Sequence, residues 1–207
     1  TGLPAHAAAE LETLHLMAYD LIVIGGGPAG YVAAIRAAQL GKSVACVESE
    51  RAGGTCLNWG CIPTKALLKN AELYQTLTHK ATEFGLKIEG LSYDWSAVIG
   101  RSRKVSDKLA GGIEFLFKKN KVDYIRGVGS IEGQGKVGVV AADGSKQVLE
   151  GANILIATGA RTRGLPQLPF NGTTVIGSRE AMILPKQPAS MIIIGAGAIG
   201  SEFAYIY

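Results

Sequence analysis

The chain has 207 residues, of which 47% are hydrophobic and 18% are charged, and its formal net charge is +4. This length gives room for one large domain, or for one domain and part of another, with a substantial core. The positive charge comes without a long basic run, and no apolar run reaches the 18 or so residues that span a bilayer, so the sequence disfavours nucleic-acid-binding and membrane-spanning proteins.

The predicted elements begin after residue 16. Residues 1–16 have no basic leader, carry two glutamates and precede Met17, which resembles a natural start. We interpret these residues as a leader or an upstream extension and leave them out of the fold prediction.

The first predicted elements form a nucleotide-binding unit. The β-branched run Tyr19–Ile24 predicts a strand that leads directly into a glycine-rich turn, residues 25–30. An alanine-rich helix from Gly30 to Leu40 follows, and then a second strand from Lys42 to Val47 that ends in Glu48. A strand, a glycine turn, a helix, a strand and a terminal acid in this order are much more selective than the glycines alone.

The glycines of this turn have the G-x-G-x-x-G spacing, and each has its own physical role. Gly25 makes the tight turn, Gly27 lets a pyrophosphate approach the backbone, and Gly30 lets the helix and the strand pack closely. The N-terminus of the helix stabilises the phosphate charge. Glu48 accepts hydrogen bonds from ribose hydroxyls and disfavours a 2′-phosphate, so FAD or NAD fits this unit and NADP does not.

The stretch Gly53–Lys65 holds two of the three cysteines, Cys56 and Cys61. A disulfide needs α-carbons roughly 4.4 to 6.8 Å apart, so these two can pair only if the chain coils tightly between them, with Gly60 as the permissive residue. Pro63 suits the first turn of a helix, which leaves Cys61 just before an electropositive N-terminus. A thiol at that place tends to lose its proton early.

The spacing of this cysteine pair favours a redox-active disulfide over two alternatives, a zinc site and two inert buried thiols. Zinc takes four ligands, and the sequence offers no second cysteine pair or nearby histidine. A close pair without a wider disulfide framework indicates a reducing compartment, so we expect a cytoplasmic protein. Cys46 lies in an apolar strand and is predicted to be a packed core thiol.

Two helical segments come next. A helix from Ala66 ends in a turn at Gly85, and a second helical stretch runs from Ser96 to Lys119. Gly111-Gly112 interrupts the second stretch, which predicts either a bend or close packing there. The apolar residues predicted to form its buried face are Val98, Val105, Leu109, Ile113 and Leu116.

The sequence then becomes rich in strand-forming residues. Val122 to Thr158 predicts a small antiparallel meander with a hairpin turn at Asp143-Gly144. It leads into the apolar run Asn153–Ala160, which predicts a buried strand ending in a turn of small residues. The following residues 161–188 hold most of the prolines, which suits a connection between domains.

The last residues repeat the design of the first unit. Met191–Ile194 predicts a strand, and Gly195, Gly197 and Gly200 after it repeat the G-x-G-x-x-G spacing of the first unit. The chain ends at Tyr207, a few residues into the helix that should follow, so we expect a fragment of a longer protein whose second unit is incomplete.

Two glycine fingerprints that flank a C-x4-C pair resemble the flavin-dependent pyridine nucleotide-disulfide oxidoreductases. The resemblance covers Met17 to Tyr207, and Cys56–Leu68 favours members that oxidise dihydrolipoamide over those that reduce glutathione or mercuric ion. It implies an α/β fold with a doubly wound, Rossmann-like FAD-binding domain (17–160) that includes the small meander. After the connection (161–188), the first strand and turn of a second Rossmann-like, NAD-binding domain (189–207) follow.

The resemblance also implies roles for individual residues. Cys61 faces the flavin, Cys56 exchanges with the lipoyl sulfur, Lys65 lies beside the flavin ring and Glu202 pairs with Lys65. The residues implied in FAD binding are Gly25, Gly27, Pro28, Ala29, Gly30, Glu48, Gly54, Thr55, Cys56, Cys61, Lys65, Thr158 and Gly159. Those implied in NAD binding are Gly195, Gly197 and Gly200.

The implied reaction passes electrons from dihydrolipoamide, carried on lipoyl domains of 2-oxo acid dehydrogenase complexes, through the disulfide and FAD to NAD. In the family the base is a histidine of the partner subunit of a homodimer, and His6, His15 and His79 do not match its motif. We therefore expect the 207 residues alone to turn over poorly or not at all. The alternatives are another disulfide reductase of the family and a non-catalytic flavin-binding fragment.

Overall fold

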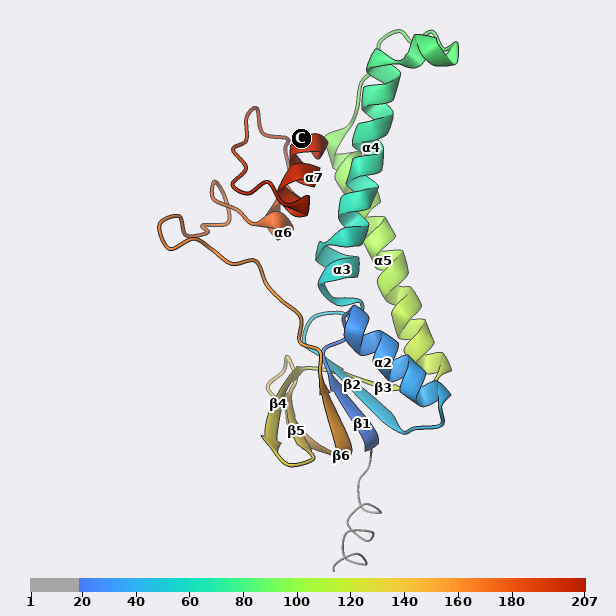
Figure 1. Cartoon of the computed structure of the whole chain (residues 1–207), viewed down its shortest axis with the longest axis vertical. Coiled ribbons are helices and arrows are strands. Elements are labelled where there is room, and N and C mark those ends of the chain that lie inside the picture. Colours follow the sequence, from blue (N-terminus) through green and yellow to red (C-terminus); the bar gives the residue numbers. More distant parts are fainter. Residues whose placement is uncertain (1–18) are drawn as a thin grey trace, which may run out of the picture. The chain divides into compact units, whose positions relative to one another are not determined.

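The computed structural model describes residues 19–207 (Figure 1). The predicted leader, residues 1–16, lies outside this range. The described chain forms two compact units, residues 19–54 with Ala110–Gly159 and Thr55–Leu109 with Ala160–Tyr207. These units divide the chain at other places than the predicted domain boundaries, which stay predictions. Among the described residues, none of the helices combines the length and the apolar character needed to cross a bilayer.

The first unit is built on a six-stranded sheet in the order β3-β2-β1-β6-β5-β4, which confirms the predicted α/β fold. Strands β1, β2 and β3 and the second half of β6 are parallel, whereas β4, β5 and the first half of β6 form the predicted antiparallel meander. The strand bounds are β1 Tyr19–Ile24, β2 Val44–Glu48, β3 Asp123–Arg126, β4 Val128–Gly133, β5 Lys136–Val140 and β6 Lys146–Ile156.

Two predictions about this sheet are wrong. Residues Asp123–Arg126 do not open the meander but join the parallel part, where they pair with β2. The end of β6 is not buried, since Ile156 is 63% exposed. An apolar run is buried throughout only where both faces of the strand are covered, and the face that carries Ile156 is largely open.

Strand β6 belongs to both parts of the sheet, because its first half pairs with β5 and its second half pairs with β1. Glu150 pairs antiparallel with Lys136 of β5, and Gly151 pairs parallel with Tyr19 of β1. A β-carbon at Gly151 would lie 2.8 Å from the side chain of Ile22. Glycine at this position therefore lets β6 approach the core of the sheet.

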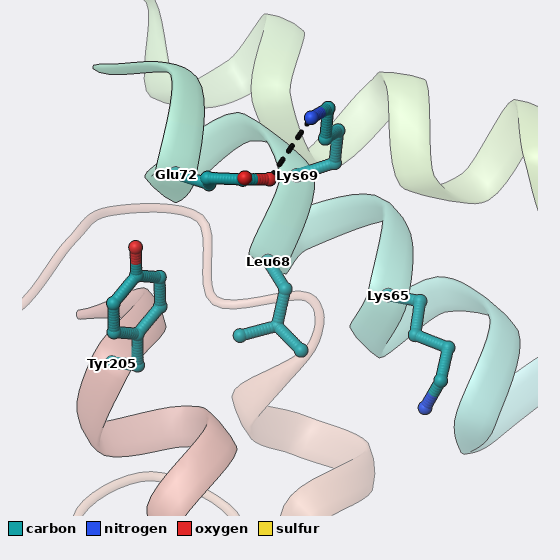
Figure 2. Close-up of a pocket in the computed structure, with 5 residues that line it drawn as sticks. All are labelled: Lys65, Leu68, Lys69, Glu72 and Tyr205. Carbon is teal, nitrogen blue, oxygen red and sulfur yellow. Dashed lines mark hydrogen bonds and ion pairs between the residues drawn. The ribbon is translucent and has the colours of Figure 1, made fainter. Parts of the chain in front are cut away.

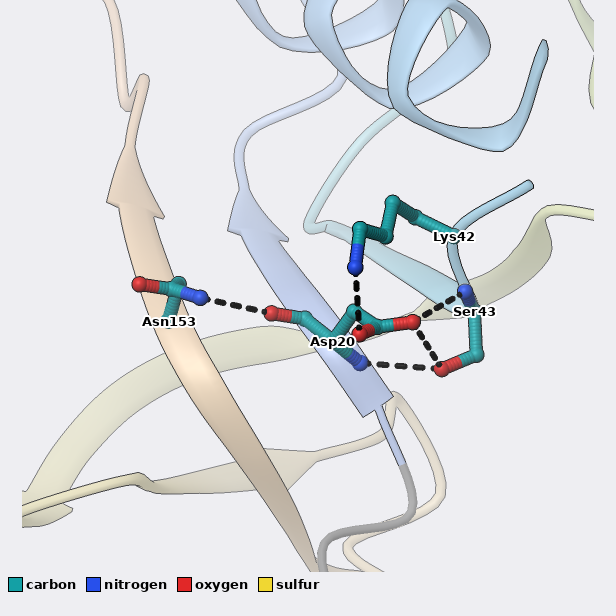
Figure 3. A network of polar contacts seen from close by, with 4 residues as sticks. All are labelled: Asp20, Lys42, Ser43 and Asn153. Carbon is teal, nitrogen blue, oxygen red and sulfur yellow. Dashed lines mark hydrogen bonds and ion pairs between the residues drawn. The ribbon is translucent and has the colours of Figure 1, made fainter. Parts of the chain in front are cut away.

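A polar network fixes the start of β1 against its neighbours (Figure 3). The Asp20 carboxylate accepts hydrogen bonds from the Ser43 amide at 2.8 Å and the Ser43 hydroxyl at 3.1 Å, and it pairs with Lys42 at 3.2 Å. Asn153 of β6 donates to the Asp20 carbonyl oxygen at 3.0 Å. The Ser43 amide, followed by the hydrogen bond from Lys42, holds the pKa of Asp20 below its ordinary value.

The core of the first unit lies around β1 and β2, and helix α2 (Pro28–Gln39) packs against these strands. One buried hydrophobic cluster of this core consists of the strand residues Ile22, Ile24, Ala45, Val47, Val137, Val139 and Leu149. Cys46 is fully buried in β2, which confirms the predicted core thiol. Burial, followed by the charge of Glu48, raises the pKa of the Cys46 thiol to about 12.

Helix α5 (Trp95–Lys119) runs without a break through Gly111-Gly112, and a β-carbon at either glycine would meet nothing within 4 Å. The predicted buried face is wrong in two members, since Leu109 is 39% and Leu116 is 36% exposed. The residues of α5 that are buried form a face next to the predicted one. This face includes small side chains, which let the helix pack closely against its neighbours. Its members are Ser102, Ser106, Ala110, Ile113 and Phe117.

The second unit is mainly helical. Its elements are α3 (Gly54–Trp59), α4 (Cys61–His79), the 3₁₀ helix η1 (Ala81–Phe84), the first part of α5, α6 (Ser178–Ala181) and α7 (Ala198–Ile206). Its buried core contains Leu67, Ala181, Met182, Phe203 and Ile206. The predicted strand Met191–Ile194 is wrong, because this extended segment pairs with no strand among the described residues and Ile192 is 92% exposed.

Candidate functional site

The first glycine turn joins β1 to α2, and its geometry explains why glycines are needed. Gly25 has φ +106°, and a β-carbon there would lie 2.2 Å from the carbonyl oxygen of Ala157. A β-carbon at Gly30 would lie 1.8 Å from the carbonyl oxygen of Gly25. Any side chain at either position would therefore open the turn.

The helix that starts at this turn has an open N-terminus. Gly27 is its N-cap in an extended conformation, Pro28 follows in the first turn, no side chain caps the helix, and the first turn holds no acidic residue. Backbone N–H groups at such an end point outward and carry partial positive charge. The turn thus fits a phosphate or pyrophosphate group, as the glycine pattern predicts.

A second pair of glycines, Gly53-Gly54, packs against this turn. The Gly53 amide donates to the carbonyl oxygen of Gly26 at 2.8 Å. Gly54 has φ +55°, and a β-carbon there would lie 2.6 Å from the α-carbon of Gly27. Gly54 is among the predicted FAD-binding residues, whereas Gly26 and Gly53 are not. Their position next to other glycines in the sequence could have indicated that they pack closely here.

Glu48 lies at the end of β2 beside the same turn. Its Oε2 accepts from the Gly26 amide at 2.7 Å, and its Oε1 accepts from the Glu50 amide at 2.7 Å. The side chain is buried, and Oε1 also accepts from the Ser49 hydroxyl at 3.4 Å, so Oε2 is the oxygen with a second lone pair for a ribose hydroxyl. Glu48 therefore shapes the glycine turn as well as occupying the position expected for ribose recognition.

The residues after β6 also reach this turn. The Ala157 amide donates to the Ile24 carbonyl oxygen at 2.8 Å, so the segment that continues into Thr158 and Gly159 passes next to Gly25. Thr158 is exposed and Gly159 has φ +71°. The structure thus brings together the predicted FAD-binding residues of the first unit, from the glycine turn to Glu48, Gly54 and Thr158-Gly159.

In the second unit, Cys56 and Cys61 lie on either side of a break between two helices. Cys56 is in α3, and Cys61 is the first residue of α4 rather than the residue before it. Gly60 lies in the break, where a β-carbon would be 3.0 Å from the Thr55 carbonyl oxygen and 3.4 Å from the Cys56 α-carbon. Close approach of the backbone, and not a left-handed conformation, is the reason for glycine here.

The two thiols are free in this structure, with Cys56 half-buried and Cys61 exposed. Burial, followed by the hydrogen bond with Cys61 and the charge of Cys61, raises the pKa of Cys56, and the charge of Lys65 opposes this shift. The two sulfurs thus differ in their exposure to solvent, since Cys56 is half-buried and Cys61 is exposed. Among residues 19–207, no three potential metal-ligating side chains gather.

Lys65 follows Cys61 by one turn of α4 and pairs with Glu202 of α7 at 3.7 Å. Lys65 also lines an open depression of about 360 Å³ (Figure 2). Lys69 lies on the same side and pairs with Glu72 at 3.0 Å, and Tyr205 faces α4 from α7. The expected Lys65–Glu202 pair is therefore present in the second unit.

The second glycine turn has the same geometry as the first. Gly195 has φ +114°, and a β-carbon at Gly200 would lie 2.0 Å from the Gly195 carbonyl oxygen. Gly197 is the extended N-cap of α7, which again has no side-chain cap and no acidic residue in its first turn. The six residues thus build the turn although the strand predicted before it is not formed.

Comparison with known proteins agrees with this arrangement. A model of the pyridine nucleotide-disulphide oxidoreductase family matches residues 19–207. Dihydrolipoyl dehydrogenase of Chlorobaculum parvum is 50% identical over 189 residues, which are 91% of this chain and 40% of that protein. The Bacillus subtilis protein of the same name is 45% identical over 194 residues, 90% of this chain and 41% of that protein.

A mitochondrial dihydrolipoyl dehydrogenase of Pisum sativum is 41% identical over 91% of this chain and 38% of its own length. The chain thus spans about two fifths of the length of these relatives. The family match covers both glycine turns and the cysteine pair between them. The chain therefore belongs to the pyridine nucleotide-disulphide oxidoreductase family.

Proposed function

We propose that this chain is the part of a dihydrolipoyl dehydrogenase that binds FAD and carries the redox-active disulfide, Cys56–Cys61. The observation that carries the proposal is the placement of the two cysteines on either side of the tight α3–α4 break at Gly60, with Lys65 one turn further on. The name of the similar proteins, dihydrolipoyl dehydrogenase, supports the substrate, dihydrolipoamide, and the name of the family supports a pyridine nucleotide as the acceptor.

The FAD site consists of the open N-terminus of α2, Glu48, Gly54 and the Thr158-Gly159 segment. The α2 amides would hold the pyrophosphate, and Glu48 would accept a hydrogen bond from the ribose of the adenosine. Bound FAD supplies an acceptor for two electrons at a time. The second glycine turn, at Gly195, has the same features and suits NAD.

The protein's own residues carry the thiol chemistry. A dihydrolipoamide thiolate attacks the Cys56 sulfur, the Cys56–Cys61 bond breaks, and Cys61 leaves as a thiolate near the helix N-terminus, which stabilises its charge. The second lipoyl thiol then displaces Cys56, so lipoamide leaves as a disulfide and the protein holds two reduced cysteines. Lys65, paired with Glu202, keeps positive charge close to this centre.

The finer assignments follow the family. We propose that the full-length protein is a cytoplasmic homodimer whose partners are lipoyl domains of 2-oxo acid dehydrogenase complexes. An acid after the second strand of the NAD unit favours NAD, and a basic pair at that place favours NADP.

The test is reduction of the oxidised, FAD-loaded chain by one equivalent of dihydrolipoamide, followed by mass spectrometry of alkylated peptides. The proposal predicts alkylation of Cys56 and Cys61 in the reduced sample and a disulfide between them in the oxidised one. FAD binding without any such disulfide would favour the alternative of a non-catalytic flavin-binding protein.

A further inference from the structure

Trp59 lies between the two cysteines in sequence, and its indole ring is held by two arginines of the second unit. The guanidinium carbon of Arg179, in α6, lies 4.0 Å from the ring centroid, and that of Arg103, in α5, lies 5.0 Å from it. Guanidinium groups within about 6 Å of an indole attract it, more strongly when they are shielded from water. The ring is thus fixed to two elements that are remote in sequence.

Arg103 also holds the backbone next to this ring. Its Nη1 donates to the carbonyl oxygen of Asn58 at 2.7 Å, in the last turn of α3, where carbonyl groups lack helical partners and favour a cation. Its Nε and Nη2 are buried with no hydrogen-bond partner among the described residues. A cation is kept in such a place only if its remaining contacts are strong, and here the charge of Asp107 acts on it together with the contacts to Asn58 and Trp59.

These contacts act on the junction that determines the cysteine geometry. Asn58 and Trp59 are the last two residues of α3, which carries Cys56, and only Gly60 separates α3 from Cys61. The charges that act on the Cys56 thiol are those of Cys61 and Lys65. The arginine cluster therefore influences the pair through the position of α3 rather than through its charge.

We propose that Trp59, clamped by Arg103 and Arg179, is a positioning residue that stabilises the Cys56–Cys61 disulfide against its dithiol form. This role rests on the proposed function. A clamped junction keeps each sulfur near the other and within the narrow range that a disulfide allows, whereas a loose junction lets the dithiol gain conformational freedom. Loss of the clamp therefore shifts the equilibrium toward the dithiol.

The test is the equilibrium of the full 207-residue chain with glutathione. In this reaction the Cys56–Cys61 bond breaks, two glutathione thiols give up two electrons and two protons to the cysteines, and glutathione disulfide forms. Trp59→Ala should lower the constant for disulfide formation about tenfold and Arg103→Gln about threefold or more, because both loosen the junction. Trp59→Phe keeps an aromatic face for the arginines, so its constant for disulfide formation should fall much less than that of Trp59→Ala.

The matched control is Arg101→Gln. Arg101 lies in the same helix and donates to the Ala66 carbonyl oxygen at 2.9 Å and to Asn70 at 2.8 Å, without touching Trp59. Its loss should weaken the packing of α5 on α4, seen as a lower urea midpoint, and leave the exchange constant within about twofold of the unchanged chain.

The outcomes separate this role from the proposed function. Equal exchange constants for Arg101→Gln and Arg103→Gln, or unchanged constants in both Trp59 variants, would overturn the positioning role alone. An unchanged chain that forms no Cys56–Cys61 disulfide in any glutathione buffer would overturn the proposed function together with this role.

Discussion

At Gly30 and Gly200 a single methyl group determines whether a glycine turn can close. In both turns the missing β-carbon would fall within about 2 Å of a carbonyl oxygen five residues earlier, at 1.8 Å in the first and 2.0 Å in the second. The second turn has this geometry without a paired strand before it. The turn is therefore a property of its own six residues.

Gly30→Ala should destabilise the first unit by about 1 to 3 kcal/mol, because the turn must open to admit the β-carbon. It should also weaken FAD binding, since opening moves the amides that face the phosphates. Gly111→Ala is the matched control: it lies in helix α5 with nothing within 4 Å, and should stabilise the protein by about 0.5 to 1 kcal/mol. Urea unfolding of both variants measures this, and equal stability changes would contradict the geometry.

Cys46 gives the protein an alkaline stability limit. Its pKa is raised from 9.0 in the unfolded chain to about 12 in the folded one. The stability linked to this thiol is therefore complete below pH 9 and is lost as the pH rises toward 12. Tyrosines with raised pKa values, such as Tyr207, add to the loss, so the contribution of Cys46 must be isolated by substitution.

Cys46→Val should make stability less dependent on pH in this range, because valine fills the site without a titrating group. The measurement is the urea midpoint of both proteins at several pH values from 8 to 10.5, below the pKa of about 12. The midpoint of the unchanged chain should fall more steeply than that of the variant. Parallel curves would show that the thiol does not titrate differently in the folded and unfolded states.

Among the elements, the break between α3 and α4 is the one that the proposed thiol chemistry depends on. Gly60→Ala places a β-carbon 3.0 Å from the Thr55 carbonyl oxygen, so the backbone at the break must shift by a few tenths of an ångström. The constant for disulfide formation with glutathione should fall about tenfold, because a disulfide tolerates little change in the separation of its α-carbons. Gly100→Ala, in α5 of the same unit with nothing within 4 Å, should leave it unchanged. Equal constants in the two variants would contradict this role of Gly60.

The sequence predicts elements well where local chemistry alone determines them. The glycine turns, the hairpin at Asp143-Gly144 and the start of α4 near Pro63 are of this kind, because each depends on a few adjacent residues. The position of Glu48 beside the first glycine turn is also predicted correctly, because Glu48 ends the strand that pairs with β1.

The sequence fails where a distant partner determines the outcome. Asp123–Arg126 joins the parallel part of the sheet because β2 offers it an edge, which no local pattern reveals. Met191–Ile194 has strand propensity but no partner strand among the described residues. Ser102 and Ser106 are buried because small side chains allow close packing, which a hydrophobic pattern overlooks. The arginines around Trp59 come from remote elements and were likewise unpredictable.

At the scale of the whole molecule, the residues of the proposed function are divided between the two compact units. The first unit contributes the glycine turn, Glu48 and the Thr158-Gly159 segment, and the second contributes the cysteine pair, Lys65 and Glu202. The family match spans both units, and the chain covers about two fifths of its relatives. Flavin binding and disulfide exchange can therefore be measured on this chain separately from complete turnover with NAD.

The most direct test is an anaerobic two-electron reduction of the FAD-loaded chain, followed by absorption spectroscopy at long wavelength. If the thiolate of Cys61 lies against the bound flavin, a charge-transfer band appears in the unchanged chain when two electrons reduce the disulfide and leave the flavin oxidised. Cys56→Ser, which has no disulfide to reduce, should show the band before any reductant is added, and Cys61→Ser should show none. A chain that binds FAD with normal affinity but shows no such band in any of the three proteins would contradict the proposal that this cysteine pair serves a flavin.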